Sequence, residues 1–389
     1  MTGPATAAVV GIGATDFSKD SGRSELMLAV QAVRAALADA GLRPAEVDGL
    51  VSFTQDTNAE IAIARELGIP ELTFFSRVHY GGGAACATVA QAAMAVRTGA
   101  ARVVVCYRAF NERSGQRFGV MQAGLAGAPT SSGVEGSWSY PFGLGTPASW
   151  VAMHARRYMH EYGAGSEDFG RVAVTMRAHA ATNPAAWFHR RPITLAQHQA
   201  SRWICEPLHL LDCCQESDGG VAIVVTSLER ARDRPHPPAV VAAAAQGSGP
   251  DQFVMTSYYR DDLAALPELG VVGRQLWAQS GLHPADIDVA VLYDHFTPFV
   301  LIQLEEMGFV GRGQAAAFVA DGEIGLSGRL PVNPHGGQLG EAYIHGMNGI
   351  AEAVRQVRQT AVNQVPGAAR VLVTAGTGVP TSGLLLTVD

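Results

Sequence analysis

The chain alternates between short apolar runs of strand length and longer segments in which apolar residues recur at helical spacing. Strand-like runs occur near residues 7–12 and at residues 103–107, where every residue is apolar. A continuous apolar run is typical of a strand buried on both faces. Helix-like segments follow Ser24, whose hydroxyl suits an N-cap, and Gly83. The alternation predicts an α/β protein with a mostly parallel, helix-covered sheet.

The same pattern occurs twice along the chain. Residues 41–50 and residues 281–290 carry Gly, Leu, Pro, Ala and Asp at the same relative places, each after a helix-like stretch and before a strand-like run. A second echo joins residues 99–105 to residues 367–373. Two copies with a long period indicate two fused half-domains rather than a solenoid. We therefore expect the chemistry where the two halves meet.

A segment rich in Pro and charge, residues 232–238, separates the two predicted halves. The first half is residues 1–235 and the second is residues 236–389. The first half also holds an insertion at about residues 111–205, rich in Gly, Ser, Pro and aromatic residues, with no visible counterpart in the second copy. We interpret this insertion as a lid or substrate wall, or as a flap that forms a dimer.

Composition narrows the classes of function. Hydrophobic residues make up 48% of the 389 residues and charged residues 16%, which favours a globular body with extensive buried surface. The formal net charge of -7 and the absence of a Lys/Arg block argue against nucleic acid as a partner. No apolar run reaches membrane-spanning length and no signal peptide is visible, so we expect a cytoplasmic protein. The five cysteines show no zinc-like spacing, which predicts reduced thiols and no metal site.

A glycine-rich loop precedes the helix that follows Gly83. Gly82 and Gly83 bring backbone N–H groups close to a ligand, and the start of a helix favours negative charge. Cys86 lies in the first turn of this helix, where a thiolate nucleophile would be stabilised. The alternative interpretation is that Cys86 is a small buried side chain.

Two further loops carry proton-transferring side chains. Tyr293 and His295 follow the strand-like run at 288–292, and alternate residues of a strand share a face. The third loop, residues 333–349, is glycine-rich and holds four such groups. They are His335, Glu341, Tyr343 and His345. Four proton carriers in one glycine-shaped loop favour acid–base chemistry over a purely structural role.

The whole chain resembles the thiolase superfamily, specifically its lipid-transfer-protein branch, which is sterol-carrier-protein-like. The duplicated halves, the Asp218-Gly-Gly motif and the Asn333-Pro-x-Gly-Gly loop occur in the family's order. The resemblance implies an α/β thiolase-like fold of five αβαβα layers with two mixed sheets, a homodimer, and acyl-CoA substrates. Coenzyme A then arrives as part of the substrate, and no cofactor is expected in this chain.

The departures from the family pattern concern its catalytic thiols. The position of the nucleophilic cysteine corresponds to about Gly83, and Cys86-Ala-Thr imitates the motif out of register. The C-terminal acid–base cysteine corresponds to about Ala375. Tyr343 stands where the family's third-loop histidine is expected, and Tyr293 replaces the first member of the second-loop motif. Compared with the family pattern, the predicted site therefore lacks both catalytic cysteines and has two tyrosines in their surroundings.

Without a thiol to carry an acyl group, this scaffold favours a retro-aldol cleavage of a β-hydroxyacyl-CoA, which needs no covalent intermediate. We expect Tyr293 and Tyr343 to divide the base and acid roles, without assigning which is which. His295 and His345 are expected to orient them, to stabilise a phenolate or to donate to the oxyanion. The remaining residues expected to bind the oxyanion or coenzyme A are Gly82, Gly83, His335, Gly336 and Gly337.

Within the superfamily, the chain resembles actinobacterial aldolases that shorten steroid side chains. This resemblance implies a 17-hydroxy-3-oxo-pregnene-20-carboxyl-CoA substrate, with androstenedione and propanoyl-CoA as products. It also implies a partner with a DUF35 domain, often fused to a hydratase subunit, which would hold any zinc. Two alternatives stay open: a thiolase that uses Cys86, and a non-catalytic carrier of sterol or acyl-CoA.

Overall fold

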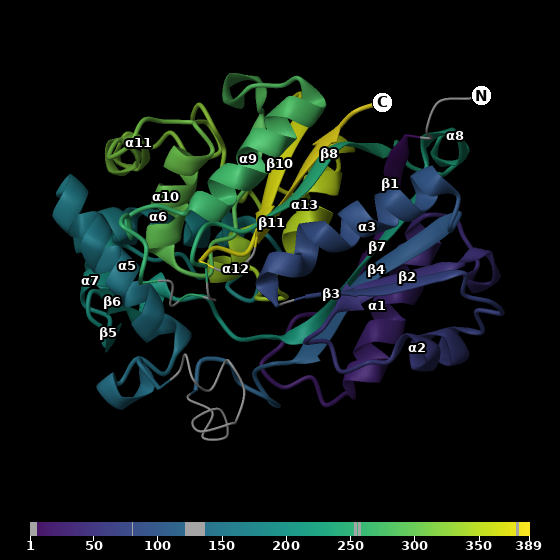
Figure 1. The fold of residues 1–389 in the computed structure, drawn as a ribbon, viewed down its shortest axis with the longest axis horizontal. Coiled ribbons are helices and arrows are strands. Elements are labelled where there is room, and N and C mark those ends of the chain that lie inside the picture. The colour runs from purple at the N-terminus through teal and green to yellow at the C-terminus, as the bar shows by residue number, and fades with distance from the viewer. Residues whose placement is uncertain (1–5, 80, 121–136, 253–254, 256–257, 379–380) are drawn as a thin grey trace.

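The computed structural model describes residues 6–79, 81–120, 137–252, 255, 258–378 and 381–389 (Figure 1). Its strands are β1 (Ala7–Ala14), β2 (Gly49–Phe53), β3 (Phe74–Val78), β4 (Val103–Asn111), β5 (Trp203–Cys205), β6 (Leu208–His209), β7 (Asp218–Ser227), β8 (Ala239–Gly247), β9 (Val289–Val291), β10 (Arg370–Ala375) and β11 (Thr381–Thr387). Its helices are α1 (Glu25–Asp39), α2 (Glu60–Leu67), α3 (Ala85–Thr98), α5 (Pro147–Tyr162), α6 (Ser166–Thr182), α7 (Leu195–Gln199), α8 (Leu228–Ala231), α9 (Pro267–Ser280), α10 (Thr297–Glu306), α11 (Ala315–Ala320), α12 (Gly337–Gly340) and α13 (Met347–Val357).

The sheet is mixed, so the prediction of a mostly parallel sheet was wrong. Its nine strands follow the order β3-β2-β4-β7-β1-β8-β11-β10-β9. Only the pairs β2–β3, β2–β4 and β9–β10 are parallel among the described strands. The two sheets expected from the resemblance meet edge to edge, because β1 pairs with β7 on one side and with β8 on the other. One antiparallel contact, Ala8 to Val240 and Val9 to Ala239, therefore joins the halves.

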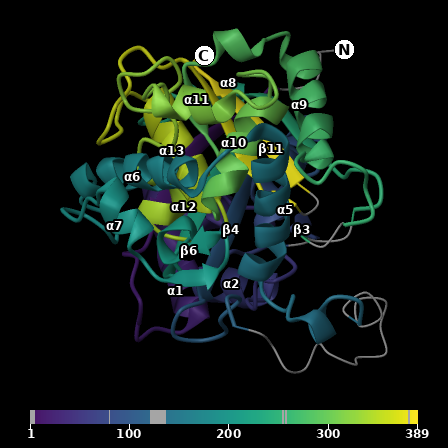
Figure 2. The same cartoon turned by 90° about the vertical axis from the view of Figure 1, so that its left-hand side faces the viewer.

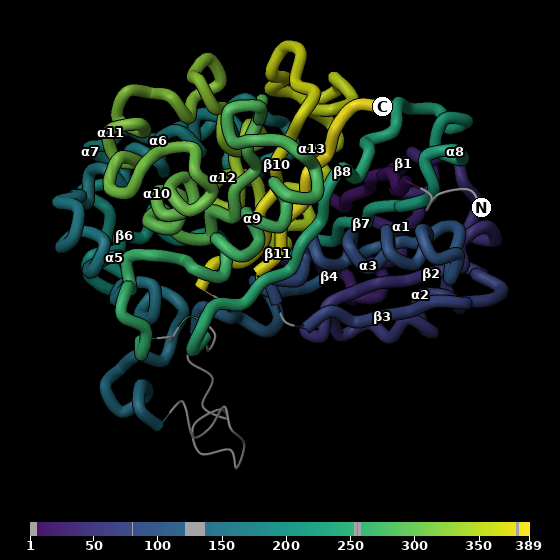
Figure 3. Tube along the Cα trace, turned by 45° about the horizontal axis from the view of Figure 1, so that its top comes forward, coloured from purple at the N-terminus to yellow at the C-terminus, as the bar shows by residue number. Residues whose placement is uncertain are grey.

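The helix–strand contacts define five layers, as the resemblance implied. In Figure 3 the first-half elements α1, β2, α3 and β4 lie on the right, and the second-half elements α9, α10 and α13 lie at the left and centre. Helix α1 packs on β1, β4 and β7 of the first half, and α9 packs on β8 and β11 of the second half. Helices α3 and α13 lie between, each in contact with strands of both halves. Helix α3 is correspondingly apolar around most of its circumference, as a helix enclosed on all sides must be. The largest apolar cluster is this central layer.

The repeated sequence folds into a repeated structure. The carboxylate of Asp48 accepts hydrogen bonds from the backbone N–H groups of residues 102 and 103 and pairs with the Arg102 guanidinium. In the second half, Asp288 accepts from the N–H groups of residues 369 and 370 and pairs with Arg370. The duplicated Asp and Arg thus fasten β4 and β10 at equivalent places. The boundary predicted between residues 235 and 236 falls between α8 and β8 and stays a prediction.

The insertion of the first half packs against the second half. Helix α6 contacts α10, α11 and α12, and the small β5–β6 sheet lies beside α5 (Figure 2). The backbone N–H of Trp187 donates to the Glu341 carbonyl in the third loop, at 2.9 Å. Residues 121–136 of the predicted insertion lie outside the described residues. No helix in the described part of the chain has the length and apolar character needed to cross a bilayer.

Candidate active site

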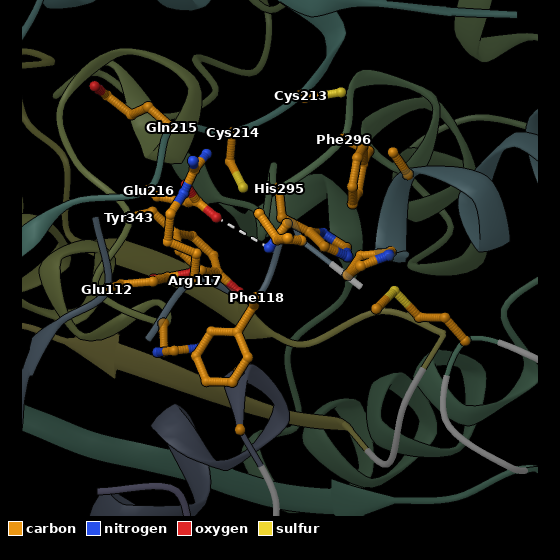
Figure 4. A pocket seen from close by; sticks show the side chains of 18 of the residues that line it. Glu112, Arg117, Phe118, Cys213, Cys214, Gln215, Glu216, His295, Phe296 and Tyr343 are labelled. Carbon is orange, nitrogen blue, oxygen red and sulfur yellow. Dashed lines mark hydrogen bonds and ion pairs between the residues drawn. The ribbon is translucent and has the colours of Figure 1, made fainter. Parts of the chain in front are cut away.

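A cavity of about 750 Å³ opens where the two halves and the insertion meet. Side chains of Glu112, Phe118, His295 and Tyr343 gather about it (Figure 4). All four residues predicted to be catalytic line it: Tyr293, His295, Tyr343 and His345. Of the two glycines of the first loop, Gly82 lines the cavity, whereas Gly83 is not among its lining residues and its carbonyl accepts from the Ser382 hydroxyl at 2.6 Å. The expected location of the chemistry is therefore the location of the cavity.

The two tyrosines contact each other through their hydroxyls. The Oη atoms of Tyr293 and Tyr343 are 3.0 Å apart, which is a hydrogen bond in which either phenol can be the donor. The Tyr293 ring lies against Gly82 and Gly346. A Cβ atom at Gly82 would be only 1.8 Å from Tyr293 Oη. The phenol thus fills the space in front of the first-loop turn, and no side chain fits at residue 82 beside it.

The Tyr293 backbone is held on both sides. Its N–H donates to Thr374 Oγ1 at 3.0 Å, and its carbonyl accepts from Gln303 Nε2 at 2.9 Å. Asn333 fixes the preceding residue, accepting from the N–H of Leu292 at 2.8 Å and donating to its carbonyl at 2.9 Å. Asn333 adopts a φ of 48°, in the left-handed region. The Asn-Pro-x-Gly-Gly motif thereby positions the second loop rather than contacting the cavity.

Both phenols are protonated at neutral pH. Burial raises the pKa of Tyr293 well above its ordinary value. Burial, followed by repulsion from Tyr293, raises the pKa of Tyr343 in the same direction. A standing phenolate is disfavoured here because burial outweighs the hydrogen bond between the two phenols, which lowers the pKa of Tyr293 only in part.

The two histidines are neutral. Burial lowers the pKa of His295 to about 3. Burial, and then the positive charge of Arg108, lowers the pKa of His345 well below its ordinary value. Neither ring carries charge at neutral pH, so the expected stabilisation of a phenolate by His295 or His345 would act through hydrogen bonding and stays a prediction. His295 remains a hydrogen-bonding group, since its Nδ1 lies 3.3 Å from Thr377 Oγ1. The His345 ring packs against the Tyr343 ring.

The glycines of the third loop do not lie at the cavity. A Cβ atom at Gly337 would meet the Asp294 carboxylate at 2.0 Å, and one at Gly336 would meet Ala180 of α6 at 2.5 Å. The N–H groups of Gln338 and Leu339 donate to Asp294. The geometry therefore gives Gly336 and Gly337 a packing role, in place of the predicted contact with the oxyanion or coenzyme A.

His335 also lies away from the cavity, in a buried polar network. Burial lowers its pKa to about 3, so its 3.8 Å contact with the Glu341 carboxylate is not an ion pair. Asn183 and Asn348 donate hydrogen bonds to that carboxylate. These hydrogen bonds hold the third loop in place. The position of His335 does not suit the predicted oxyanion or coenzyme A contact.

Cys86 faces away from the cavity. Its sulfur lies 3.7 Å from the Val373 carbonyl in β10, the side chain is fully buried, and burial raises its thiol pKa. Cys213 and Cys214 do line the cavity, and burial raises the pKa of both thiols. None of these three thiols is a thiolate at neutral pH. The sequence predicted only reduced thiols and did not single out Cys213 or Cys214 as cavity residues.

Several charged residues of the cavity were not predicted from the sequence, among them Glu112 and Lys19. Glu112 follows β4 directly, and burial raises its pKa well above the ordinary value of a carboxyl. Lys19 also lines the cavity, close enough to Glu112 for the two charges to interact, and burial lowers the pKa of Lys19 to about 8. The only signal for Glu112 was its place at the end of a buried strand, where α/β sheets put their sites.

The walls of the cavity divide into apolar and cationic parts. The insertion supplies much of the apolar wall. Its apolar and aromatic members among the described residues are Phe118, Val120, Tyr140, Pro147, Ala148, Trp150 and Ile204, and Leu210 and Met255 come from elsewhere. Arginines 113, 117 and 202 are exposed and, with Lys19, supply positive charge. The interpretation of the insertion as a substrate wall agrees with this arrangement.

A duplicated five-layer fold with its cavity at the junction, two phenols in the cavity and no accessible nucleophilic thiol defines a protein of the thiolase superfamily with an altered active site. Residues 254–386 match the family model for the thiolase C-terminal domain. Human mitochondrial 3-ketoacyl-CoA thiolase has the same fold, with a TM-score of 0.68 at 15% identity.

Closer similarity extends over the whole chain. It is 69% identical to a steroid side-chain-cleaving aldolase of Thermomonospora curvata over 99% of both chains. It is 70% identical to a 17-hydroxy-3-oxo-4-pregnene-20-carboxyl-CoA lyase of Mycobacterium tuberculosis over 98% of both. The solved structure of an Ltp2–ChsH2(DUF35) aldolase matches with a TM-score of 0.95 and 68% identity, covering 99% of this chain and 98% of that one. The chain belongs to the steroid side-chain-cleaving aldolases of the thiolase superfamily.

Proposed function

We propose that this protein is a carbon–carbon lyase that cleaves 17-hydroxy-3-oxo-4-pregnene-20-carboxyl-CoA by a retro-aldol reaction. The bond between the carbinol carbon and the carbon next to the thioester breaks. Its electron pair forms the enolate of propanoyl-CoA, while the carbinol carbon becomes the ketone of androstenedione. The hydroxyl proton leaves, and one proton is added to the enolate carbon, so the reaction needs no net acid or base.

The observation that carries this proposal is the 3.0 Å contact between the Tyr293 and Tyr343 hydroxyls. One phenol oxygen accepts the substrate's hydroxyl proton as it passes its own proton to the other phenol. In the same event the second phenol passes its own proton to the enolate carbon, so both tyrosines end as neutral phenols. Because burial disfavours a phenolate at either residue, a relay in which neither tyrosine is ionised overall suits this site better than a standing phenolate base.

The cavity's other groups fit the rest of the substrate. Neutral His295 and His345 are hydrogen-bond partners for the thioester oxygen as negative charge develops on it. The apolar wall suits the steroid rings, which offer little to hydrogen-bond. The exposed cationic residues suit the phosphates of coenzyme A. A cavity of about 750 Å³ lies within the usual range for small-molecule sites.

The test is to incubate the protein with this CoA ester and to measure both products together with the intact mass of the enzyme. We expect equimolar androstenedione and propanoyl-CoA, no acylated protein, and unchanged turnover in Cys86→Ala. An acyl group on Cys86, together with loss of activity in Cys86→Ala, would instead establish a thiolase. Binding of the ester without release of either product would establish a carrier.

We also propose that the protein works with a DUF35-domain partner, in the cytoplasm. The β5–β6 sheet supports a docking surface for this partner: Trp203, Ile204 and Leu210 are exposed by 50%, 37% and 42%, and Ile204 and Leu210 reach the cavity. All five cysteines are free, as is usual in a reducing compartment.

Co-expression with a tagged DUF35 protein tests the docking surface. We expect the wild-type chain and Met27→Arg to be retained on the tag, and Trp203→Arg to be lost. Met27 is a matched control, because it is also 50% exposed and lies on α1 of the first half. Equal retention of Trp203→Arg would place the partner elsewhere.

A further inference from the structure

The strand β4 carries a fully buried arginine next to the cavity. The Arg108 side chain has 0% exposure, and its guanidinium pairs with the Asp56 carboxylate at 3.2 Å. Asp56 is equally buried and also accepts from the N–H of Ala109 and from Asn58. The guanidinium carbon lies 4.4 Å from the centre of the Phe110 ring. Arg108 is thus held in place from several sides and does not itself line the cavity.

The free edge of this guanidinium contacts a cavity residue. Arg108 Nε lies 3.2 Å from His345 Nδ1. A guanidinium has only N–H donors and keeps its proton in proteins, so the histidine nitrogen must be the acceptor. An Nδ1–H tautomer, or an imidazolium, would turn an N–H toward the N–H of arginine. The contact therefore requires a neutral His345 ring whose single proton is on Nε2.

The other side of the ring opens onto the cavity. His345 lines the cavity, and among the described residues Nε2 has no hydrogen-bond partner in the protein and is not enclosed. The backbone at His345 has a φ of 49°, which a non-glycine residue rarely adopts. Strain of this kind is kept where the surrounding structure fixes a functional geometry.

We propose that Arg108 is a positioning residue for the reaction proposed above: with Asp56, it holds His345 as a neutral donor whose Nε2–H points to the thioester oxygen. The groups that face His345 and titrate or carry charge are Arg108 on β4, His295 in the second loop and Tyr343 beside it. Removing the arginine removes the group that selects the tautomer and disfavours the imidazolium.

The tautomer is measured directly by nitrogen NMR of histidine-labelled protein, with the His345 signals identified by their loss in His345→Asn. We expect a protonated Nε2 and an unprotonated Nδ1 in the wild type. This spectrum needs no substrate, so it tests Arg108 even if the proposed reaction fails. A wild-type His345 with the proton on Nδ1 would overturn the proposal.

Kinetics of a charge-balanced variant supply the second test. Arg108→Met combined with Asp56→Asn leaves no unpaired buried charge. We expect kcat/KM for the steroid CoA ester to fall by about 10- to 100-fold, the usual effect of losing a group that orients a functional histidine. We also expect the loss of activity toward acid pH to move to higher pH, because burial still lowers the His345 pKa but the charge of Arg108, its second cause, is gone. Arg108→Lys should restore part of the rate and move this loss back toward lower pH.

The matched control is Arg358→Met with Asp39→Asn, which removes another largely buried ion pair whose residues do not line the cavity. This variant should lose stability and keep the wild-type pH profile. Wild-type kcat/KM and an unchanged pH profile in the Arg108 double variant would contradict the positioning role. A wild-type enzyme that releases neither androstenedione nor propanoyl-CoA would refute the proposed function alone.

Discussion

Tyr293 reaches Tyr343 because residue 82 has no side chain and because hydrogen bonds hold the loop that carries the phenol. Both tyrosines were predictable from sequence, since each stands where the family's motifs carry other residues. Glu112, Lys19 and Cys214 were not, because they reach the cavity only through the tertiary fold. The structure places the predicted His335, Gly336 and Gly337 outside the cavity lining. Sequence alone does not distinguish a glycine that makes room for a carboxylate from one that makes room for a ligand.

Gly82→Ala tests the close approach to Tyr293. A methyl group at residue 82 must displace the phenol, because the two atoms would be 1.8 Å apart. We expect kcat to fall by about 100-fold, within the range for losing one acid–base group. Gly165→Ala is the control, since a Cβ atom there meets Asp168 only at 3.8 Å. A Gly82→Ala enzyme with wild-type kcat would show that the position of Tyr293 is not critical.

Lys19 predicts a pH dependence of KM. Its pKa is lowered to about 8, so its positive charge is present below that pH and is lost as the pH rises through it. If the ammonium attracts the CoA ester, KM should rise above pH 8 by about five-fold, which corresponds to about 1 kcal/mol. Lys19→Arg should remove this rise, and Lys19→Met should show the high KM at every pH. A flat KM profile in the wild type would rule out this contribution.

At the scale of elements, the internal repeat was the most reliable part of the sequence. It predicted paired helices and strands, and it extends to the carboxylates that fasten β4 and β10. Strand direction was not predictable in the same way. Strand β7 pairs antiparallel with β1 and β4, and β8 pairs antiparallel with β11. These partners are distant in sequence, and local apolar runs contain no information about them.

The duplicated carboxylates should contribute to stability in parallel. Asp48→Asn and Asp288→Asn each weaken two hydrogen bonds from backbone N–H groups and one ion pair. We expect each to lower the free energy of unfolding by about 1–3 kcal/mol, measured by urea denaturation. The effect at Asp288 should be no larger, because its side chain is 27% exposed against 12% for Asp48. An Asp48→Asn variant with the wild-type free energy of unfolding would show that the repeated carboxylate does not stabilise the fold.

At the scale of the whole molecule, the resemblance predicted more than the residues alone did. The five-layer stack was expected, because the resemblance implies it. The joining of both sheets through β1 and β8 was not expected, because it depends on one short antiparallel contact.

We propose that the protein is a homodimer, as the resemblance implies. Strand β3 supports this proposal, since it ends the sheet and carries Phe75 with 65% exposure.

Light scattering tests the dimer. Phe75→Glu places a charge on the β3 edge and should convert a dimer of the wild-type chain to a monomer. Val388→Glu, at a position 48% exposed near the C-terminus, should leave the mass unchanged. A Phe75→Glu protein that remains dimeric would move the interface away from β3.

The tyrosine pair is tested most directly by a double-mutant cycle on kcat for the steroid CoA ester. Tyr293→Phe and Tyr343→Phe each interrupt the same proton path, so each alone should lower kcat by about 10²–10⁴-fold. Tyr259→Phe, at a position 65% exposed, is the control. Since the two phenols act as one unit in this account, the double variant should be no slower than the slower single variant. Effects that multiply, or single variants with wild-type kcat, would contradict a relay through Tyr293 and Tyr343.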